Sequence, residues 1–344
     1  MNSLERFIAT LENQPVDRPA SWLGIPTESA LPELFKYFGV SDMIGLKAAI
    51  GDDIWPVEVP YNHPPANHIA CAFDFAKESH SISSEERTLT DPGFFEDMED
   101  PARVDDFPWP DPADHMSAEA CRKEVQKVPE GYVKMGILWA AHFQDVCAAF
   151  GMCNALMTML TAPEMFKAVI DRIVEFYLKA GEIFYEATKG ELDAVLIGND
   201  FGSQTALMVA PEQLREFAFE GTRRLVEQAK SYGLRVVHHS CGSVRPIIGD
   251  LIDCGVDSIH PIQALAAGME PQGLKTDFGG KTCFCGGVDA QNLLVNGTPE
   301  DVRAKVYELR SIFPTGLIIS PSHEAILPDI NPANVKALFE AVRD

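Results

Sequence analysis

The chain is 344 residues long, and 46% of its residues are hydrophobic against 23% charged, so it can bury a large core and is not disordered. Its 28 Lys and Arg residues face 51 Asp and Glu residues, which gives a net charge of −23. A field of this sign repels phosphate backbones and anionic lipids, so we expect neither nucleic acid nor a membrane as a partner. No stretch approaches the roughly 20 apolar residues that span a bilayer. Eight scattered cysteines fit reduced thiols better than a disulfide framework, and we expect a cytoplasmic protein that acts on a small molecule.

The first part of the chain contains few regular elements. The extreme N-terminus has the pattern of an amphipathic helix, and the apolar runs Ala20–Ile25 and Ile54–Val59 can supply two strands. The acidic segment Glu99–Asp114 holds too many prolines for a helix or a central strand. We interpret it as an ordered surface excursion, because Phe107 and Trp109 give it something to bury.

From Gly131 onward, short apolar runs alternate with amphipathic helical patterns. Pro163, Pro211 and Pro299 are each followed by Glu, which suits the first turn of a helix. The strands expected in this part are Tyr132–Leu138, Ala194–Gly198, Arg235–His239, Ser258–Pro261, Thr282–Cys285 and Leu317–Ser320. The helices expected between them are Pro163–Ala187, Pro211–Ser231, Val244–Cys254 and Pro299–Phe313.

Strands and helices that alternate in this number predict an α/β fold, either a parallel barrel or a doubly wound sheet. No G-x-G-x-x-G motif follows a strand and no G-x-x-x-x-G-K-[ST] motif occurs, which weakens the case for a nucleotide-binding sheet. We therefore expect a (β/α)8 TIM barrel with an N-terminal extension and the Pro-rich excursion. It would form one domain over residues 1–344, with the first strands and loops in 1–130 and the regular repeats in 131–344.

Polar residues stand at or just after the carboxyl ends of the expected strands. In a (β/α)8 barrel these ends converge on one mouth, where such proteins carry their sites. We therefore expect the following residues to lie together: Asn199, Asp200, His239, Ser240, Cys241, His260, Gln263, Cys285, Asp289, His323 and Glu324.

A His-x-Cys pattern at the end of one expected strand indicates a metal site. His239 and Cys241 are two residues apart, so their side chains share one side of the strand. Zinc prefers imidazole and thiolate, and a catalytic zinc takes about three protein ligands. His323 is the expected third ligand by position, and Cys285 is a less favoured alternative. A buried thiol beside a core histidine explains the His-x-Cys pattern about equally well.

Other polar residues at this mouth are candidates for catalysis or substrate binding. We expect Asp200 and Glu324 to be catalytic, as acid, base or counter-charge, although Asp200 also fits a helix cap or a turn. The expected substrate-binding residues are Gln204, His260, Gln263 and Asp289.

Two further sets of polar residues fit structural roles. His238 points to the opposite face of its strand from His239, and we expect it in the core or behind the site. Asp52 and Asp53 follow Gly51, and turn chemistry explains them nearly as well as catalysis does.

Several longer segments occur in an order typical of one superfamily. They are PVDRP near the N-terminus, GNDFGSQTALMVAPEQLREF, RVVHHSCGSVRPIIGDLIDCGVDSIHPIQ, FCGGVDAQNLLVNGTPEDV and GLIISPSHEAILPDINPANVKAL. Together they resemble the uroporphyrinogen decarboxylase superfamily over nearly the whole chain. The resemblance implies a (β/α)8 barrel with its site at the C-terminal mouth.

This superfamily contains two chemistries, and the sequence is more similar to one of them. True uroporphyrinogen decarboxylases are cofactor-free and carry an arginine-bearing segment after the PVDRP-like start, which holds a tetrapyrrole's acidic side chains. Here that place reads SWLGIPTESALPEL, and no arginine occurs between Arg18 and Arg87. The zinc-dependent, corrinoid-linked methyltransferases share the His-x-Cys-Gly motif, which implies His239 and Cys241 as ligands. Their third ligand is a thiolate after the last strand, where this chain has His323.

Likeness to the methyltransferase branch implies methyl transfer to or from cobalamin. Zinc would activate a thiol, or an O- or N-methyl donor would be activated for attack by cobalt. The chain has no D-x-H-x-x-G corrinoid motif, so a corrinoid protein would be its partner. Cofactor-free decarboxylation and a non-catalytic ligand-binding barrel are the alternatives. The methyl donor, the acceptor and the oligomeric state stay open, a homodimer included.

Overall fold

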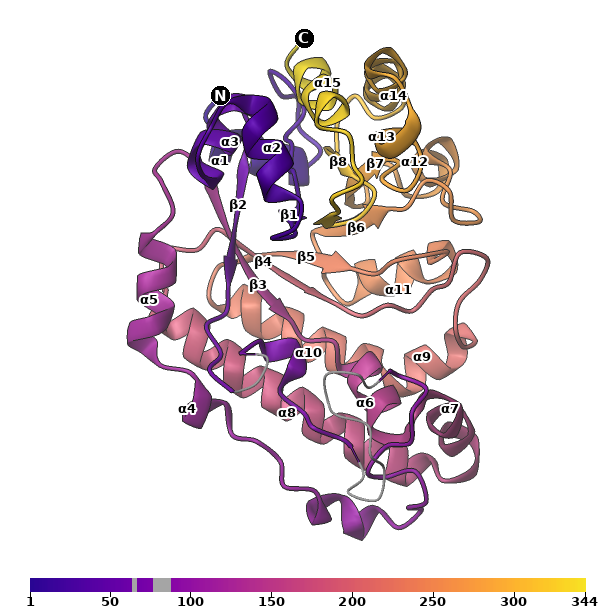
Figure 1. Ribbon diagram of the computed structural model, residues 1–344. Coiled ribbons are helices and arrows are strands. Elements are labelled where there is room, and N and C mark those ends of the chain that lie inside the picture. The colour runs from indigo at the N-terminus through magenta and orange to yellow at the C-terminus, as the bar shows by residue number, and fades with distance from the viewer. Residues whose placement is uncertain (64–66, 77–87) are drawn as a thin grey trace.

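The computed structural model describes residues 1–63, 67–76 and 88–344, and its centre is a curled, parallel sheet (Figure 1). Its seven strands are neighbours in chain order, from β2 to β8. They are β2 Ile54–Glu58, β3 Val133–Trp139, β4 Ala194–Gly198, β5 Arg235–His239, β6 Ser258–Ile262, β7 Cys283–Val288 and β8 Leu317–Pro321. A curled parallel sheet of this order is TIM-barrel-like.

Residues 20–22 join the two edges of this sheet. On one side they exchange backbone hydrogen bonds with Ile319 of β8, at 2.9 and 3.1 Å. On the other side Ser21 O accepts from Asp53 N, just before β2, at 3.2 Å. This segment therefore takes the place of an eighth strand, within the range Ala20–Ile25 expected from the sequence.

Helices surround the sheet, mostly on its outer side, whereas the first helix packs into the barrel from the amino ends of the strands (Figure 1). In the first half of the chain they are α1 Ser3–Leu11, α2 Leu31–Phe38, α3 Met43–Ile50, η1 Ile69–Cys71, η2 Pro101–Asp106, α4 Pro112–His115, α5 Ala118–Gln126, α6 His142–Phe150, α7 Met152–Thr161 and α8 Pro163–Ala187. They continue with α9 Pro211–Phe217, α10 Phe219–Ser231, η3 Arg245–Ile247, α11 Ile248–Asp253, α12 Pro271–Phe278, α13 Leu293–Asn296, α14 Pro299–Ile312 and α15 Pro332–Arg343. The short β1 (Ile25–Pro26) pairs in parallel with β9 (Ala325–Ile326), beside the main sheet.

The elements expected after Gly131 are confirmed, with two corrections. The pattern over Pro211–Ser231 predicts one helix, but the chain breaks at Ala218 into α9 and α10. At this break the Ala218 carbonyl accepts a hydrogen bond from His142 Nε2 at 3.1 Å. The helix expected over Val244–Cys254 is likewise divided, into η3 and the shorter α11.

The interior of the barrel below its mouth is mostly apolar, with the buried hydroxyl groups of Ser258 and Ser320 beside Cys283 and Cys285. Phe7 and Leu11 of α1 pack into this interior from the amino ends of the strands. The strands contribute Ile54, Val133, Met135, Ile137, Ala194, Leu196, Val237, Cys283, Cys285 and Ile318, each at most 2% exposed.

Charged groups at the amino ends of the strands, here called the floor, pair with one another. Asp53 is 0% exposed and accepts hydrogen bonds from Arg6 Nη1 and Arg18 Nη1, each at 2.7 Å. Its neighbour Asp52 pairs with the buried Lys47. These pairs give both aspartates a structural role.

The Pro-rich segment Glu99–Asp114 carries η2 and the start of α4, and both helices pack against α8. Phe107 is buried there, and Trp109 Nε1 donates to Val104 O at 2.8 Å. The division of the chain at residue 130 stays a prediction.

No single helix among the described residues is long and apolar enough to cross a bilayer. The helices α6 and α7 reach that length and composition only as a pair, bent by 94°.

Candidate functional site

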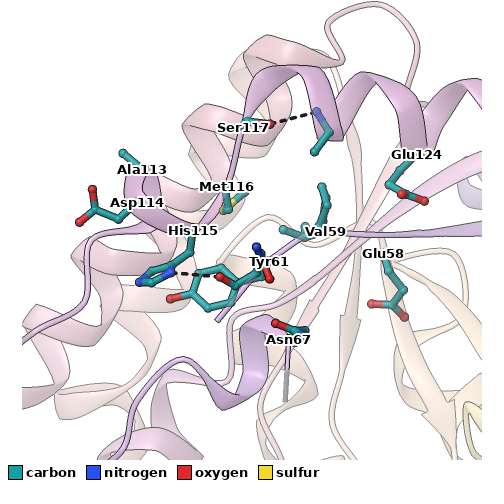
Figure 2. A pocket seen from close by; sticks show the side chains of 13 residues that line it. Glu58, Val59, Tyr61, Asn67, Ala113, Asp114, His115, Met116, Ser117 and Glu124 are labelled. Carbon is teal, nitrogen blue, oxygen red and sulfur yellow. Dashed lines mark hydrogen bonds between the residues drawn. The ribbon is translucent and has the colours of Figure 1, made fainter. Parts of the chain in front are cut away.

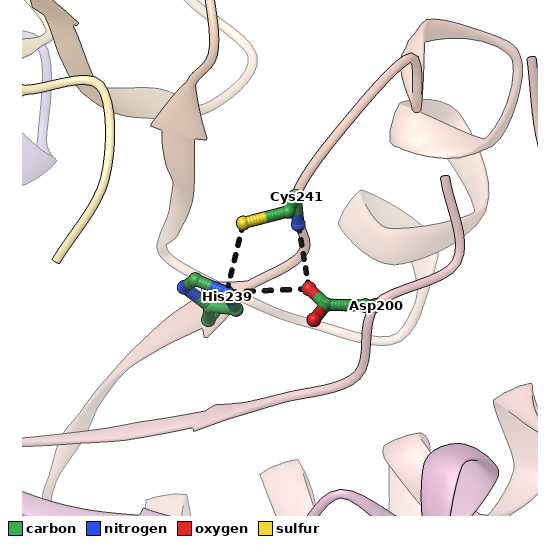
Figure 3. Close-up of side chains that lie close together, drawn as sticks. All are labelled: Asp200, His239 and Cys241. Atoms are coloured by element: carbon green, nitrogen blue, oxygen red, sulfur yellow. Dashed lines mark hydrogen bonds and ion pairs between the residues drawn. The ribbon is translucent and has the colours of Figure 1, made fainter. Parts of the chain in front are cut away.

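Three polar side chains converge where β4 and β5 end (Figure 3). Cys241 Sγ lies 3.3 Å from His239 Nε2, and Asp200 Oδ1 lies 3.3 Å from the same nitrogen. The backbone N–H of Cys241 donates to Asp200 Oδ1 at 2.9 Å. One ligand atom from each residue therefore falls within 4.8 Å of the other two, close enough for a single metal ion.

The other ring nitrogen of His239 faces a second set of polar atoms. His239 Nδ1 lies 2.9 Å from His260 Nδ1 and 3.5 Å from Glu324 Oε2. Burial lowers the pKa of His260 well below its usual value, and the neighbouring His239 lowers it further, so His260 is neutral. A neutral His260 can accept the Nδ1–H of His239, so a metal that displaces the Nε2 proton of His239 could bind through that nitrogen.

His323 follows β8 and approaches the cluster from a different strand. Its Nδ1 accepts a backbone N–H at 3.0 Å, and its ring also hydrogen-bonds Cys241. One ligand atom each of His323, Cys241 and Glu324 lie within 4.8 Å of one another. His239 belongs instead to two other sets, one with Cys241 and Asp200 and one with His260 and Glu324. The sulfur of Cys241 is common to the first of these sets and to the set of His323, and the three ligands expected from the sequence do not form one set by themselves.

Two glycines and a buried amide shape the backbone around Cys241. Gly198 of β4 lies so close to β5 that a Cβ there would stand 2.2 Å from His239 O. Gly242 has a φ of +88°, which residues with side chains rarely adopt. Its N–H donates to Gln263 Oε1 at 2.7 Å. These contacts hold the chain on both sides of Cys241.

The electrostatics of the cluster favour charged forms of its members. Burial lowers the pKa of His239, but Glu324, Cys241 and Asp200 outweigh burial and raise it well above its usual value. Burial raises the pKa of Cys241, but His239 and His323 outweigh burial and lower it. Burial also raises the pKa of Asp200, yet the hydrogen bond from His239 holds that pKa well below its usual range. No lysine or arginine among the described residues pairs with these groups.

The backbone is strained beside the cluster. Trp139 and Ala140, at the end of β3, have φ values of +62° and +58°, in the left-handed region. The ring of Trp139 stands edge-on to that of His239, with 6.0 Å between their centres. Strain of this kind costs on the order of 1–3 kcal/mol per residue and concentrates at functional sites.

Three of the candidate residues lie elsewhere. Gln204 is exposed in the loop after β4. The carboxylate of Asp289 accepts the backbone N–H groups of residues 291–293 at 2.9 to 3.1 Å, so it serves the turn into α13. Cys285 lies in the apolar interior, where burial raises the pKa of its thiol well above the usual value. We therefore leave Cys285 out of the proposed ligand set.

A cavity of about 320 Å³ opens beside the cluster, with His323 and Gln263 in its wall. Ser322 also lines this cavity, and its hydroxyl accepts the Ala290 N–H at 3.0 Å. Ser322 could not be identified from the sequence, because its partner Ala290 is 32 residues away and no local pattern links the two.

A larger cavity, of about 830 Å³, begins at the carboxyl end of β2 (Figure 2). Glu58 of β2 and Glu124 of α5 line it, and Tyr61 lies beneath His115 (Figure 2). No residue of the metal-ligand cluster lines this second cavity.

A curled parallel sheet with ligand groups at the carboxyl ends of its strands defines a TIM-barrel-like protein with a site at its mouth. A family model described as uroporphyrinogen decarboxylase (URO-D) matches residues 80–344, which is most of the chain. The chain belongs to the uroporphyrinogen decarboxylase family, as its motifs indicate.

Two similar curated proteins are the uroporphyrinogen decarboxylases of Chlorobium luteolum, 27% identical over 161 residues, and Chlorobaculum tepidum, 26% identical over 158 residues. Each match covers 44% of this chain and 42% of the relative, so the aligned part spans less than half of those proteins. A solved structure described as a methyltransferase from Methanosarcina mazei has a TM-score of 0.70 and 19% identity. It matches 99% of this chain and 98% of its own, which shows a common fold.

Proposed function

We propose that this chain is a zinc-dependent methyltransferase of a corrinoid-linked system. One observation carries the proposal: thiolate, imidazole and carboxylate groups from three strand ends converge, and no lysine or arginine of the described part of the chain pairs with them. The methyltransferase with the same fold supports this branch of the family.

The residues present fit a zinc ion. Glu324 Oε2 is buried and has no hydrogen-bond partner among the described residues, so the cluster has unused ligand capacity. Sulfur, nitrogen and oxygen ligands together suit zinc, which is borderline-soft. We assign His239 and Cys241 as two ligands and His323 as the third, with Asp200 as its competitor.

The chain's own residues would prepare this site for methyl transfer. His260 and Glu324 face Nδ1 of His239 and fix the orientation of its ring. Asp200 holds the backbone N–H of Cys241 in place. When bound, the metal would lower the pKa of a substrate thiol, which supplies a thiolate nucleophile at neutral pH.

The methyl group would travel to or from cobalamin carried by a partner protein. The chain itself has no D-x-H-x-x-G corrinoid motif. The ligand cluster stands at the strand ends, where a barrel mouth can admit a second protein's cofactor. We place this exchange, between the chain and a corrinoid protein, in the cytoplasm.

A second candidate function is cofactor-free decarboxylation, which the printed names of the relatives support. Its substrate carries several carboxylates and needs cationic partners. Arg6 and Arg18 are already paired with Asp53 at the floor. Turnover of uroporphyrinogen III by metal-free protein would favour this candidate over methyl transfer.

Metal analysis tests the proposed function. Purified protein should contain about one zinc per chain, and Cys241→Ala should lose it because the shared sulfur ligand is gone. Cys285→Ala is the matched control, since it also removes a buried thiol and should keep the zinc. Full activity of metal-free protein, or zinc retained in Cys241→Ala, would sink the proposal.

The third ligand can be identified with two variants. His323→Ala should weaken zinc binding more than Asp200→Asn, which keeps the size of the side chain and one acceptor for the Cys241 N–H. The opposite order would assign the third position to Asp200.

A further inference from the structure

The cavity beside His323 touches the ligand cluster through two side chains. The ring of His323 hydrogen-bonds Cys241, and Gln263 Oε1 holds the Gly242 N–H at 2.7 Å. Both side chains also line the cavity, whose volume is about 320 Å³. A molecule in this cavity would therefore contact His323 and Gln263, the two side chains that separate the cavity from Cys241.

Among the described residues in the wall of this cavity, the one fixed charge is negative, at Asp329. Its ionisable side chains are His323 and Asp329, and no lysine or arginine occurs among the described residues that line it. Asp329 is exposed and forms no ion pair or side-chain hydrogen bond with another described residue. Asp200 and Glu324 stand in the adjoining cluster, so the negative charge continues beyond the wall.

Gln263 offers a hydrogen-bond donor to this space. The residue is only 5% exposed, and its carbonyl oxygen is used by the Gly242 N–H. Its NH₂ group has no partner among the described residues, although an amide can donate two hydrogen bonds. Gln263 Nε2 is nevertheless not one of the buried polar atoms that lack a partner, so this amide group reaches the accessible space of the cavity, where an oxygen atom of a bound molecule can accept from it.

We propose that this cavity is the substrate pocket and that it takes a small neutral or cationic molecule and rejects anions. The proposal rests on the proposed function, which puts a reactive metal beside the pocket. A volume of about 320 Å³ is at the lower end of ligand pockets, and a tetrapyrrole is too large for it. A cationic group would pair with Asp329, and Gln263 would donate to an oxygen of the substrate.

Three thiols of similar size test this charge selection on protein loaded with Co²⁺ in place of zinc. Cysteamine is cationic, mercaptoethanol is neutral and mercaptopropionate is anionic, and absorption of the cobalt–thiolate reports their binding. We expect mercaptopropionate to bind at least about tenfold more weakly than the other two, because a cleft of one charge sign depletes ions of that sign. Equal affinities, or tighter binding of the anion, would overturn the proposal.

Two variants of Asp329 test whether this residue of the cavity wall causes the preference among the three thiols. Asp329→Asn should weaken cysteamine and leave mercaptoethanol unchanged, whereas Asp329→Lys should improve mercaptopropionate. The matched control is Asp105→Asn. Asp105 is also an exposed carboxylate, but it pairs with Arg172 and does not line the cavity. If Asp329→Lys leaves the order of the three thiols as it was, Asp329 does not face the substrate and the assignment is wrong.

An experiment on metal-free protein separates this proposal from the function on which it rests. Neutral iodoacetamide and anionic iodoacetate alkylate Cys241, and mass spectrometry of peptides gives the two rates, with the exposed Cys153 as internal reference. The neutral-to-anionic rate ratio should be about tenfold larger at Cys241 than at Cys153. Equal ratios would overturn the charge selection even in a protein that binds zinc. A large ratio in a protein that takes up no metal would overturn the zinc function and leave the pocket's selectivity standing.

Discussion

At the floor of the barrel each buried aspartate meets a lysine or an arginine, whereas at the mouth the carboxylates meet histidines, a thiol and backbone N–H groups. Asp53 lies between Arg6 and Arg18, and Asp52 pairs with Lys47. Asp200 and Glu324 face His239 and His323 instead. The floor is therefore saturated with charge partners, while the mouth has room for an added cation.

This contrast separates stability from function within one barrel. A buried aspartate that is paired with a lysine or an arginine has no free charge to offer a ligand, so its role is structural. Histidine and cysteine can lose their protons and then bind a metal, so the other end of the same barrel can hold a reactive ion. The first prediction below changes the floor and measures the result at both ends, and the other two change residues next to His239.

The largest effect on stability is expected at the floor. Asp53→Ala leaves the guanidinium groups of Arg6 and Arg18 without their buried partner, and breaking such a pair costs about 3–5 kcal/mol. Denaturant unfolding measures the loss, and the zinc content of the folded fraction should not change. The exposed pair of Arg172 and Asp105 is the control, because Asp105→Asn should cost less than about 1 kcal/mol. A loss of metal on changing Asp53 would contradict the separation of the two ends.

An intermediate effect, on zinc affinity, is expected for His260, which contacts the proposed ligand His239. His260→Leu removes the acceptor that holds Nδ1 of His239, and loss of such a partner weakens metal binding about 10- to 100-fold. Competition with a chelator measures the affinity. His260→Asn places an oxygen near the position of Nδ1 and should restore most of the affinity. If both variants bind zinc as the parent does, His260 does not position His239.

The smallest effect concerns the neighbouring histidine on the other face of β5. His238 is 0% exposed, and neither of its ring nitrogens has a partner among the described residues. Burial, with His239 and His142, lowers its pKa to about 3. Between the unfolded-state pKa near 6.5 and the folded-state pKa of about 3, His238 is protonated in the unfolded chain but not in the folded chain. The free energy of unfolding therefore decreases as the pH is lowered from about 6.5 to about 3.

That dependence can be removed by substitution. At pH 5.5, one pH unit below the unfolded-state pKa, His238 lowers the free energy of unfolding by about 1.4 kcal/mol. His238→Phe should shrink the difference in unfolding free energy between pH 7.5 and 5.5 by this amount. An unchanged difference would show that His238 accepts its proton in the folded chain.

The strands were predictable because they are short apolar runs bounded by glycine, proline or polar residues, and β4 and β5 begin and end as the pattern predicts. The break at Ala218 was not, because it coincides with a bond to His142, 76 residues earlier. Periodicity in a single helix holds no information about such a distant donor.

The candidate site was predictable where side chains stand directly at strand ends. His239 and Cys241 converge with Asp200 because neighbouring parallel strands end together. Asp289 also follows a strand, but the local backbone N–H groups take its oxygens first. Cys285 lies deeper in its strand and faces the apolar interior. Gln263 and Asp329 line one cavity although they come from distant loops, and no local pattern places them together.

The short pairing of β1 with β9 also governs when the site can form during synthesis. Ile25 N donates to Glu324 O at 2.7 Å, and a Cβ on Gly24 would stand 2.2 Å from the same oxygen. Ile25, which is synthesised early, can therefore form this contact only after Glu324 has been synthesised, and the last part of the mouth forms then. A nascent chain that has emerged only as far as β7 carries His239 and Cys241 but lacks both His323 and β8, the strand with which residues 20–22 pair to close the sheet. If the proposed zinc site is correct, metal binding by the complete cluster would for this reason be a late event, and it would report that the whole barrel has closed.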